Sequence, residues 1–292
     1  MEVMRLRFAI VGGDRRQVCL AGLLRQDGHR VSTYALEKAE LPAEIPKAGC
    51  LQGCVYAADC VILPTPAEAG ALLRAPLGAE SLSAGELIAS LWEGQRLFGG
   101  AMSDELCLAA LRQGLRVEDL LRRQDFSVGN AALTAEGAIG ELIAHSEKSL
   151  WRSRVLLCGW GRIGKLLTPR LLGLGAHLCV AARGAADRAT AAALGAESCD
   201  FSALGARLGE FDFLINTVPA RILDESALCA AKEGALLVEL ASAPGGFDRK
   251  LAENIGLRVL HCPGLPGRIS PQSAAEVMRE AIYASLAEGE ET

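Results

Sequence analysis

The stretch Arg154–Gly164, RVLLCGWGRIG, decides the fold of the C-terminal half of this chain. An apolar run leads into three glycines with the spacing G-x-G-x-x-G, namely Gly159, Gly161 and Gly164, and the residues after them carry leucines at helical spacing. A strand, a tight glycine turn and a helix in this order are the context that the dinucleotide fingerprint needs. The first glycine permits the turn, the second lets the backbone approach a pyrophosphate, and the third lets the helix pack close to the strand.

The start of the helix and the end of the next strand indicate how the dinucleotide is held. We expect the pyrophosphate at the N–H groups around Arg162 and Ile163, where the helix dipole favours an anion. The next strand ends in HLCVAAR at Arg183, where an NAD site usually has Asp or Glu, and no acid follows until Asp187. A guanidinium suits the 2′-phosphate of NADP through charge and bidentate geometry. We therefore expect NADP, with NAD as the alternative.

Length and composition limit the class of protein. The 292 residues predict about two domains, and with 50% hydrophobic but only 4% aromatic residues the cores must be aliphatic. Lys and Arg number 30 against 35 Asp and Glu, so the net charge of −5 gives no reason to expect nucleic acid or an acidic membrane as a ligand. The ten cysteines fall mostly in apolar runs, without a zinc spacing, as in a protein of the reducing cytoplasm. No signal peptide or bilayer-length apolar run is visible.

The N-terminal part, residues 1–128, is predicted to be an α/β domain that binds the substrate. Its first strand runs into a second glycine turn, Gly12–Gln17, whose spacing differs from that of the dinucleotide fingerprint. Two irregular loops are expected, over residues 36–54 and 64–79, because both are rich in Pro and Gly. The expected strands are 7–12, 30–34, 59–64, 96–98 and 115–118, and the expected helices reach to Arg25 and cover 84–91 and 104–113.

The remainder is predicted to consist of an interdomain helix, a cofactor domain and a returning helix. The Ala- and Gly-rich segment 129–150 suits a connection between domains, and residues 151–270 carry the Rossmann domain. A last helix within 273–288 is placed to return to the first domain, and the acidic end, 288–292, is expected to fray. The strands of the cofactor domain are predicted at 155–158, 177–182, 197–199, 212–217, 235–240 and 257–261. The fold class is thus α/β, with two Rossmann-like doubly wound domains and a central cleft.

Working residues of an open α/β sheet lie beyond the carboxyl ends of its strands. Three turns of the cofactor domain follow such ends, at 216–220, 240–246 and 262–267, and they should line the nicotinamide half of the cleft. Their small and polar side chains can hydrogen-bond a carboxamide, a ribose or a substrate. The cofactor candidates are Asn216, Thr217, Val218 and Pro219, and Ser242 is a substrate candidate.

Six segments together resemble a known family. GGDRRQ at 12–17, NAALTAEGAI at 130–139, GWGRIG at 159–164, NTVPA at 216–220, LASAPGG at 240–246 and PGLPG at 263–267 look like the A subunits of dipicolinate synthase. The resemblance covers essentially the whole chain. It implies a dehydrogenase that oxidises a dihydrodipicolinate-type cyclic imine to dipicolinate with NAD(P). It also implies that the partner is a flavoprotein-like B subunit and that the protein works in the mother-cell cytoplasm of a sporulating bacterium.

A planar dicarboxylate substrate needs cationic or N–H partners. Arg15, Arg16 and Gln17 stand at a helix start in the first domain and are the first choice, and Arg268 is the second. The sequence is poorer in proton acceptors. The candidates for a catalytic base are His261, Glu136 and Asp14, and water can also serve, because aromatisation needs little help from a strong base.

Two other interpretations stay open. The 2-hydroxy-acid dehydrogenases share the domain plan, but LASAPGG occupies the place of their arginine segment, and the alanine dehydrogenases and transhydrogenases differ in the first domain. A non-catalytic NADP-binding partner of another protein would also fit a chain without an obvious base. In each case we expect an oligomer.

Overall fold

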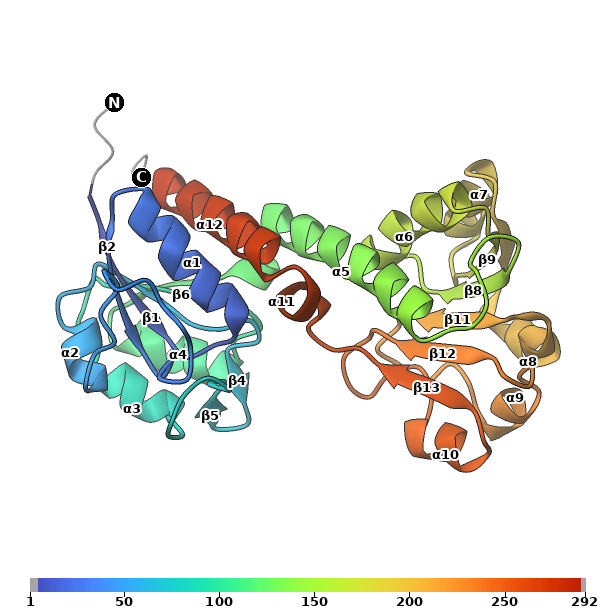
Figure 1. Cartoon of the computed structure of the whole chain (residues 1–292), viewed down its shortest axis with the longest axis horizontal. Coiled ribbons are helices and arrows are strands. Elements are labelled where there is room, and N and C mark those ends of the chain that lie inside the picture. The colour runs from blue at the N-terminus through green and yellow to red at the C-terminus, as the bar shows by residue number, and fades with distance from the viewer. Residues whose placement is uncertain (1–4, 290–292) are drawn as a thin grey trace. The chain divides into compact units, whose positions relative to one another are not determined.

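The computed structural model describes residues 5–289 and divides into two compact units. Among these residues, the first unit consists of residues 5–130 with 266–289, and the second of residues 131–265. Each unit holds one parallel sheet with helices on its faces, so the predicted α/β class with two doubly wound domains is confirmed (Figure 1). No helix within the described range is long and apolar enough to cross a bilayer.

The first unit contains a five-stranded sheet in the order β2-β1-β3-β6-β7, with every neighbouring pair parallel. This is the doubly wound order 2-1-3-4-5, in which ligands bind where the order reverses, next to β1. The strands are β1 (Arg7–Val11), β2 (Arg30–Tyr34), β3 (Cys60–Ile62), β6 (Arg96–Gly99) and β7 (Arg116–Asp119), and the helices that follow are α1 (Arg15–Gln26), α2 (Leu51–Val55), α3 (Ala84–Ala89) and α4 (Asp104–Arg112).

Both loops predicted for this unit contain regular structure, which corrects the expectation. The short helix α2 overlaps the end of the first, where Cys50 caps the helix by accepting a hydrogen bond from the backbone N–H of Gly53. The second holds a small antiparallel hairpin of β4 (Glu68–Ala69) and β5 (Leu72–Leu73). Strands of two residues leave no alternating pattern in a sequence, so the Pro- and Gly-rich composition concealed them.

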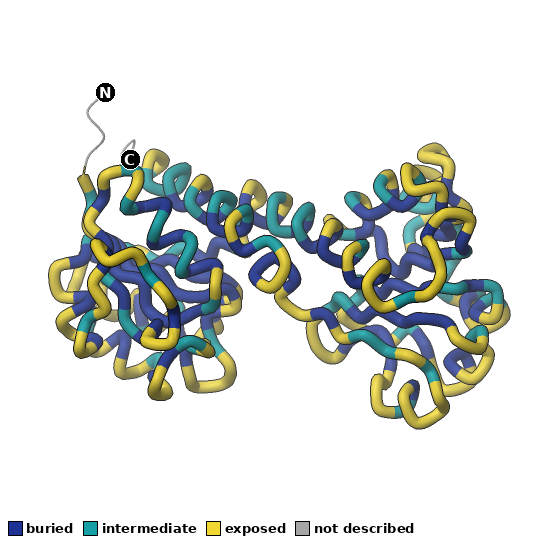
Figure 2. Tube along the Cα trace, in the orientation of Figure 1, coloured by how far each residue is buried: buried dark blue, intermediate teal, exposed yellow. Residues whose placement is uncertain are grey.

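Apolar layers cover both faces of the first sheet. Phe8 and Ile10 of β1 face α1 and α12 (Pro271–Glu288), whose Met278 and Ile282 are fully buried. The alternate residues of β1 face the layer that α3 and α4 supply. The central strands β1, β3 and β6 are buried on both sides and their sequences are mostly apolar, whereas the outer strands β2 and β7 are partly exposed and mixed in composition. Buried residues are dark blue in Figure 2.

The second unit holds a six-stranded parallel sheet in the order β10-β9-β8-β11-β12-β13, the 3-2-1-4-5-6 order of dinucleotide-binding domains. All six predicted strands are present. They are β8 (Arg154–Cys158), β9 (His177–Ala181), β10 (Glu197–Cys199), β11 (Phe213–Asn216), β12 (Leu236–Glu239) and β13 (Arg258–His261), connected through α6 (Arg162–Gly173), α7 (Ala185–Ala193), α8 (Leu204–Arg207), α9 (Glu225–Cys229) and α10 (Arg249–Asn254).

The helices at the unit boundaries differ in detail from the prediction. The helix α5 (Gln124–Ala144) begins about one and a half turns earlier than expected, and its later residues, such as Leu142, belong to the core of the second unit. PGLPG is not only a turn, since α11 (Leu265–Ile269) begins within it. Residues 290–292 of the acidic end, for which fraying was predicted, lie outside the described range.

Candidate functional site

The glycine turn between β8 and α6 has the close approaches that the sequence predicts. Gly159 has φ +108°, and a Cβ there would collide with Oγ1 of Thr217. A Cβ on Gly164 would collide with the carbonyl oxygen of Gly159, so the first turn of α6 lies directly on the end of β8. Both positions therefore require glycine, one for its conformation and both for space.

Gly161 is different, because a Cβ added at this residue would point into open space. It is the N-cap of α6, and among the described residues no side chain caps this helix. No described atom lies within 4 Å of the position that a Cβ would take. A helix start of this kind, with free space in front of it, fits a pyrophosphate group and would hold it through backbone N–H groups. The residues present thus suit a dinucleotide.

The turn after β11 lies against this glycine turn. The hydroxyl of Thr217 donates to the carbonyl of Cys158 at 2.8 Å, which ties the end of β11 to the end of β8. Asn216 is fully buried, and its Nδ2 donates to the carbonyl of Val218 at 2.9 Å and to Oε1 of Glu239 at 2.7 Å. Both amide hydrogens of Asn216 are used inside the protein, so its side chain shapes the turn, and its place in the cofactor site stays a prediction. Pro219 is exposed at the tip.

Glu239, at the carboxyl end of β12, is a residue that the sequence reasoning missed. Its side chain is buried, and besides Asn216 it accepts from the backbone N–H of Ala241 at 2.9 Å and of Gly246 at 2.8 Å. It therefore joins the turn after β11 to the turn that carries the exposed Ser242. The one available signal was an acid within the apolar run LLVEL, since a buried carboxylate needs several partners.

Arg183 lies just beyond the end of β9 and is exposed. Within residues 5–289 no carboxylate pairs with its guanidinium. The turn around it is fixed by Arg188, whose Nη1 donates to the carbonyls of Ala182 and Arg183, each at 2.7 Å, and to Oδ2 of Asp200 at 2.9 Å. Arg183 is thus a cation on an ordered backbone.

The glycine turn of the first unit leads into a helix whose start is already occupied by a carboxylate. Asp14 caps α1 and pairs with Arg16 through Nε–Oδ1 and Nη2–Oδ2 contacts of 3.0 and 2.8 Å. Burial raises the pKa of Asp14, but the hydrogen bonds from Arg16 and the charges of Arg16 and Arg74 outweigh it, so the pKa lies below its usual value. Arg16 is buried and also donates to the carbonyl of Thr65. Arg16 therefore holds this turn together through Nε and Nη2, and its role as a substrate ligand stays a prediction.

The other candidates of the first unit are also either buried in hydrogen bonds or exposed. Gln17 is fully buried, and its Oε1 accepts from the backbone N–H of Asp14 at 2.9 Å, completing the capping box. Arg15 is exposed beside it. Arg74, which the sequence did not single out, is also exposed, and its carbonyl accepts from Gly13 N at 2.9 Å. Arg15 and Arg74 are thus two exposed cations near the start of α1, and Arg268 is a third exposed one in α11.

The candidate bases belong to three different elements of the two units. His261 is largely exposed at the end of the edge strand β13, and partial desolvation of its ring together with the charge of Arg249 lowers its pKa. Glu136 is exposed on α5, and Asp14 is ion-paired. Which of these three side chains accepts a proton, or whether water does, stays a prediction.

Comparison with known proteins gives two family matches and a relative of full length. Residues 7–121 match the family model of the N-terminal domain of the dipicolinate synthase A subunit. Residues 105–253 match that of the NAD-binding domain of D-isomer specific 2-hydroxyacid dehydrogenases. The dipicolinate synthase A subunit of Bacillus subtilis (strain 168) is 27% identical over 290 residues, which cover 97% of this chain and 96% of the relative.

Solved structures agree with these matches. The crystal structure of the dipicolinate synthase A subunit from Bacillus halodurans superposes with a TM-score of 0.86 at 25% identity, covering 97% of this chain and 98% of that one. The transhydrogenase from Sinorhizobium meliloti has a TM-score of 0.69 at 18% identity over 95% of this chain and 93% of its own, a likeness of fold alone. The resemblance inferred from the six sequence segments is confirmed.

Proposed function

We propose that the chain oxidises dihydrodipicolinate or its hydroxylated precursor to dipicolinate, because it belongs to the family of dipicolinate synthase A subunits. Over residues 105–253 it also belongs to the family of the NAD-binding domains of D-isomer specific 2-hydroxyacid dehydrogenases. The chain is an oxidoreductase of the kind that uses a nicotinamide dinucleotide. The observation that carries the proposal is the open helix start at Gly161, framed by the two glycines that have no room for a side chain.

The reaction removes a hydride and a proton from a dihydropyridine ring. Nicotinamide supplies the hydride acceptor, and the proton goes to water. The residues of this chain then have to bind and orient the reactants. In this proposal the turn at Gly159–Gly164 holds the pyrophosphate, the turn after Thr217 lies beside the nicotinamide ribose, and the loop held by Glu239 presents Ser242 to the substrate.

We propose NADP as the cofactor, with Arg183 as the ligand of its 2′-phosphate. Changing Arg183 to Asp should weaken NADPH binding about 10- to 100-fold, because a charge-assisted contact of roughly 1–3 kcal/mol is replaced by repulsion. NADH affinity should stay the same or rise. Fluorescence titration of both cofactors measures this, and Lys250→Asp, an equal change of charge at an exposed site on α10, is the control. Equal NADPH affinity in Arg183→Asp and wild type would contradict the assignment.

We propose Arg15 and Arg74 as ligands of the substrate carboxylates. Arg15→Ala and Arg74→Ala should each raise the substrate KM about 10-fold or more, the loss expected for one charge-assisted hydrogen bond, while the NADPH Kd stays unchanged. Lys38→Ala, which removes an exposed charge elsewhere in the first unit, is the control. A lower kcat with an unaltered KM would place the substrate elsewhere.

The test of the activity itself is direct. Purified chain, with freshly prepared dihydrodipicolinate precursor and NADP, should produce the ultraviolet band of dipicolinate, either by itself or with a B subunit. The partner is proposed because the Bacillus subtilis relative is itself one subunit, the A chain, of a dipicolinate synthase. If the chain binds NADP but produces no dipicolinate under either condition, the enzyme proposal is wrong and the non-catalytic NADP-binding interpretation holds.

A further inference from the structure

Two cysteine thiols are in contact on neighbouring strands of the second sheet. Sγ of Cys179, in β9, lies 3.8 Å from Sγ of Cys199, the last residue of β10, and the thiol of Cys179 donates to the sulfur of Cys199. Both side chains belong to the same apolar layer and are buried, with Cys199 the more accessible at 9% exposed against 1%. A reaction that activates one sulfur therefore finds the other in contact with it.

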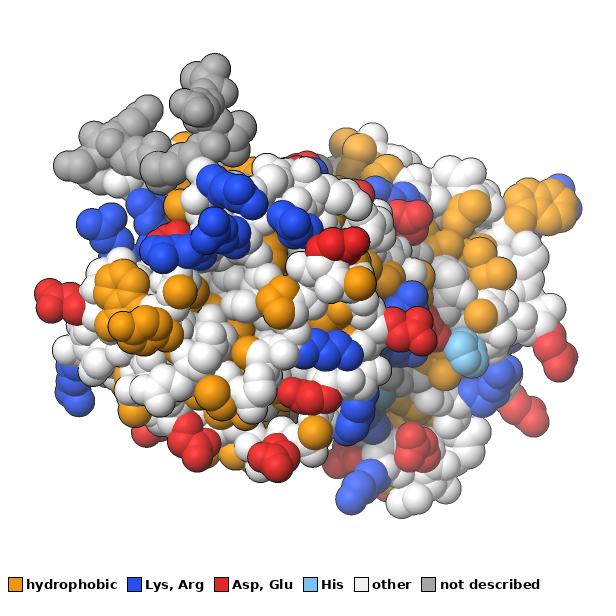
Figure 3. Space-filling view, turned by 60° about the vertical axis from the view of Figure 1, so that its left-hand side comes forward, with side chains coloured by type: hydrophobic (Ala, Val, Ile, Leu, Met, Phe, Trp, Pro, Cys, Tyr) orange, Lys and Arg blue, Asp and Glu red, His pale blue; other side chains and the backbone are white. Residues whose placement is uncertain are grey.

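A guanidinium stands beside the two sulfurs. Nη1 of Arg207, on α8, donates to Sγ of Cys179 at 3.4 Å. The other nitrogens of Arg207 pair with acids, since Nη2 donates to Oε2 of Glu197 at 2.9 Å and Nε donates to Oε1 of Glu210 at 3.0 Å. The face of the chain in Figure 3 likewise carries charges of both signs, but here one N–H of the cation is directed at a sulfur. A cation next to a thiol stabilises the thiolate, which is the form that reacts.

The two thiols differ in acidity. The hydrogen bond from Cys179 lowers the pKa of Cys199, and the charge of Arg207 acts in the same direction, against the desolvation of the sulfur. The proton stays on Cys179, because the same hydrogen bond and burial raise the pKa of that thiol. At neutral pH, Cys199 therefore carries more thiolate than an ordinary cysteine, with a thiol in contact. A low-pKa cysteine beside a second cysteine is the arrangement of redox-sensitive sites.

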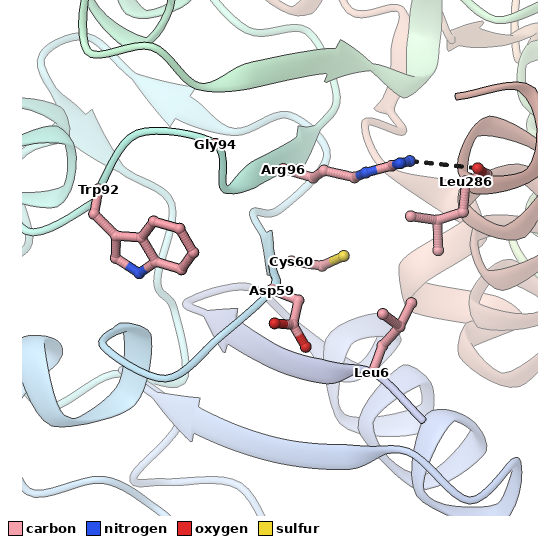
Figure 4. A pocket seen from close by; sticks show the side chains of 7 residues that line it. All are labelled: Leu6, Asp59, Cys60, Trp92, Gly94, Arg96 and Leu286. Atoms are coloured by element: carbon pink, nitrogen blue, oxygen red, sulfur yellow. Dashed lines mark hydrogen bonds between the residues drawn. The ribbon is translucent and has the colours of Figure 1, made fainter. Parts of the chain in front are cut away.

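Cys60 of the first unit shows what the second thiol adds. Cys60 is buried in the wall of a small cavity that is also lined by Arg96, and Figure 4 shows no other cysteine among the residues drawn there. Desolvation outweighs the charge of Arg96 and raises the pKa of Cys60 to about 12. An arginine near a buried cysteine is thus not sufficient to stabilise the thiolate in this protein, and the hydrogen bond between the sulfurs distinguishes the pair.

The strand register determines what a bond between the two sulfurs would require. Cys199 is opposite Ala181 and Cys179 is opposite Glu197, so the cysteines are diagonal neighbours, two residues apart in register. Strands about 4.8 Å apart with a rise of about 3.3 Å per residue put such Cα atoms about 8 Å apart, whereas a disulfide spans at most about 7 Å without backbone movement. The strand β10 has three residues and lies at the edge of the sheet. It is therefore the element that has to shift.

The end of β10 is connected to the turn at Arg183. The carbonyl of Cys199 accepts from the backbone N–H of Ala182 at 3.1 Å. Asp200, the next residue, accepts from Nη1 of Arg188 at 2.9 Å, and the same Nη1 donates to the carbonyls of Ala182 and Arg183. A shift of β10 consequently displaces groups that fix the backbone under the guanidinium of Arg183.

We propose that Cys179 and Cys199 are an oxidation site, at which hydrogen peroxide joins the two sulfurs as a disulfide, and that this bond weakens NADP binding. The second part rests on the proposed function, in which Arg183 holds the 2′-phosphate. The Cys199 thiolate attacks the peroxide, the O–O bond breaks, and the leaving hydroxide takes up a proton to become water. Cys179 then attacks the resulting sulfenic acid, the S–O bond breaks as the S–S bond forms, and water leaves with the thiol proton. Two thiols are oxidised, and one peroxide is reduced to two waters.

The bond is tested by treating the purified full-length chain with a small excess of hydrogen peroxide. Mass spectrometry of a non-reduced digest should show the peptides of Cys179 and Cys199 joined, and dithiothreitol should separate them. Cys199→Ser should lack this link, while Cys229→Ser, which removes an exposed thiol on α9, should retain it. Arg207→Gln should slow the reaction about 3- to 10-fold relative to Arg207→Lys, which keeps the cation. An oxidised wild type without the link between Cys179 and Cys199 would overturn the site.

The affinity for NADPH is the second readout. In fluorescence titrations, the oxidised wild type should have a Kd for NADPH about 3- to 10-fold above that of the reduced chain, and dithiothreitol should restore the lower value. Peroxide should leave this Kd unchanged in Cys179→Ala and Cys199→Ala, but not in Cys229→Ser. A mapped disulfide with unaltered NADPH affinity would refute the effect on the cofactor. A reduced wild type that does not bind NADPH would refute the proposed cofactor and that effect together, while the disulfide map still decides the oxidation site.

Discussion

Gly161→Ala should leave the protein folded and reduce NADPH affinity at least about 100-fold. The φ of −78° at this position is one that alanine adopts readily, and no described atom lies within 4 Å of the added Cβ. The methyl group would occupy the space in front of the first N–H groups of α6, where the pyrophosphate has to approach the backbone. A loss of about 3 kcal/mol in binding corresponds to this factor.

The matched variant is Gly164→Ala, only three residues away. Here the added Cβ meets the backbone carbonyl of Gly159, which cannot move without separating α6 from β8. We expect a destabilisation of about 1–3 kcal/mol or more, seen as a lower melting temperature. If Gly161→Ala lowers the melting temperature as much as Gly164→Ala does, or keeps wild-type NADPH affinity, the cofactor does not lie across this turn.

The fold could be predicted because its signals are local. The residues between Arg154 and Gly164 contain the strand, the glycine turn and the helix start in one continuous stretch. The central parallel strands, such as β1 and β8, are apolar runs. The hairpin at Glu68–Leu73 was missed because strands of two residues are held by register with each other and carry no period of their own.

The site was less predictable, because residues far away in the sequence decide which of its polar side chains are buried and which are exposed. Arg15 and Arg16 look alike in the chain, yet Arg16 is buried against Asp14 and Thr65 while Arg15 is exposed. Arg74 reaches the same region through a hydrogen bond from Gly13 to its carbonyl, across about sixty residues. Contacts between residues so far apart in the chain leave no local sequence motif. The residue type therefore indicated a carboxylate-binding arginine but not which arginine is exposed.

Glu239→Ala should be the most destabilising substitution in the second unit. Two buried donors, Nδ2 of Asn216 and the backbone N–H of Gly246, and the part-buried N–H of Ala241 would lose the carboxylate that accepts from them. Each buried donor left unpaired costs about 1–3 kcal/mol, so we expect a total of about 3–5 kcal/mol in the free energy of unfolding, since part of the loss is relieved by relaxation.

The conservative variant separates charge from packing. Glu239→Gln keeps one acceptor but turns an NH₂ group toward a donor, so we expect an intermediate loss and weaker NADPH binding, because the turns after β11 and β12 depend on the same side chain. Glu253→Ala, an exposed glutamate of α10, should stay within about 0.5 kcal/mol of wild type in urea unfolding. If Glu239→Ala unfolds at the same urea concentration as Glu253→Ala, the carboxylate does not hold these two turns together, and its place at the end of β12 has no structural consequence.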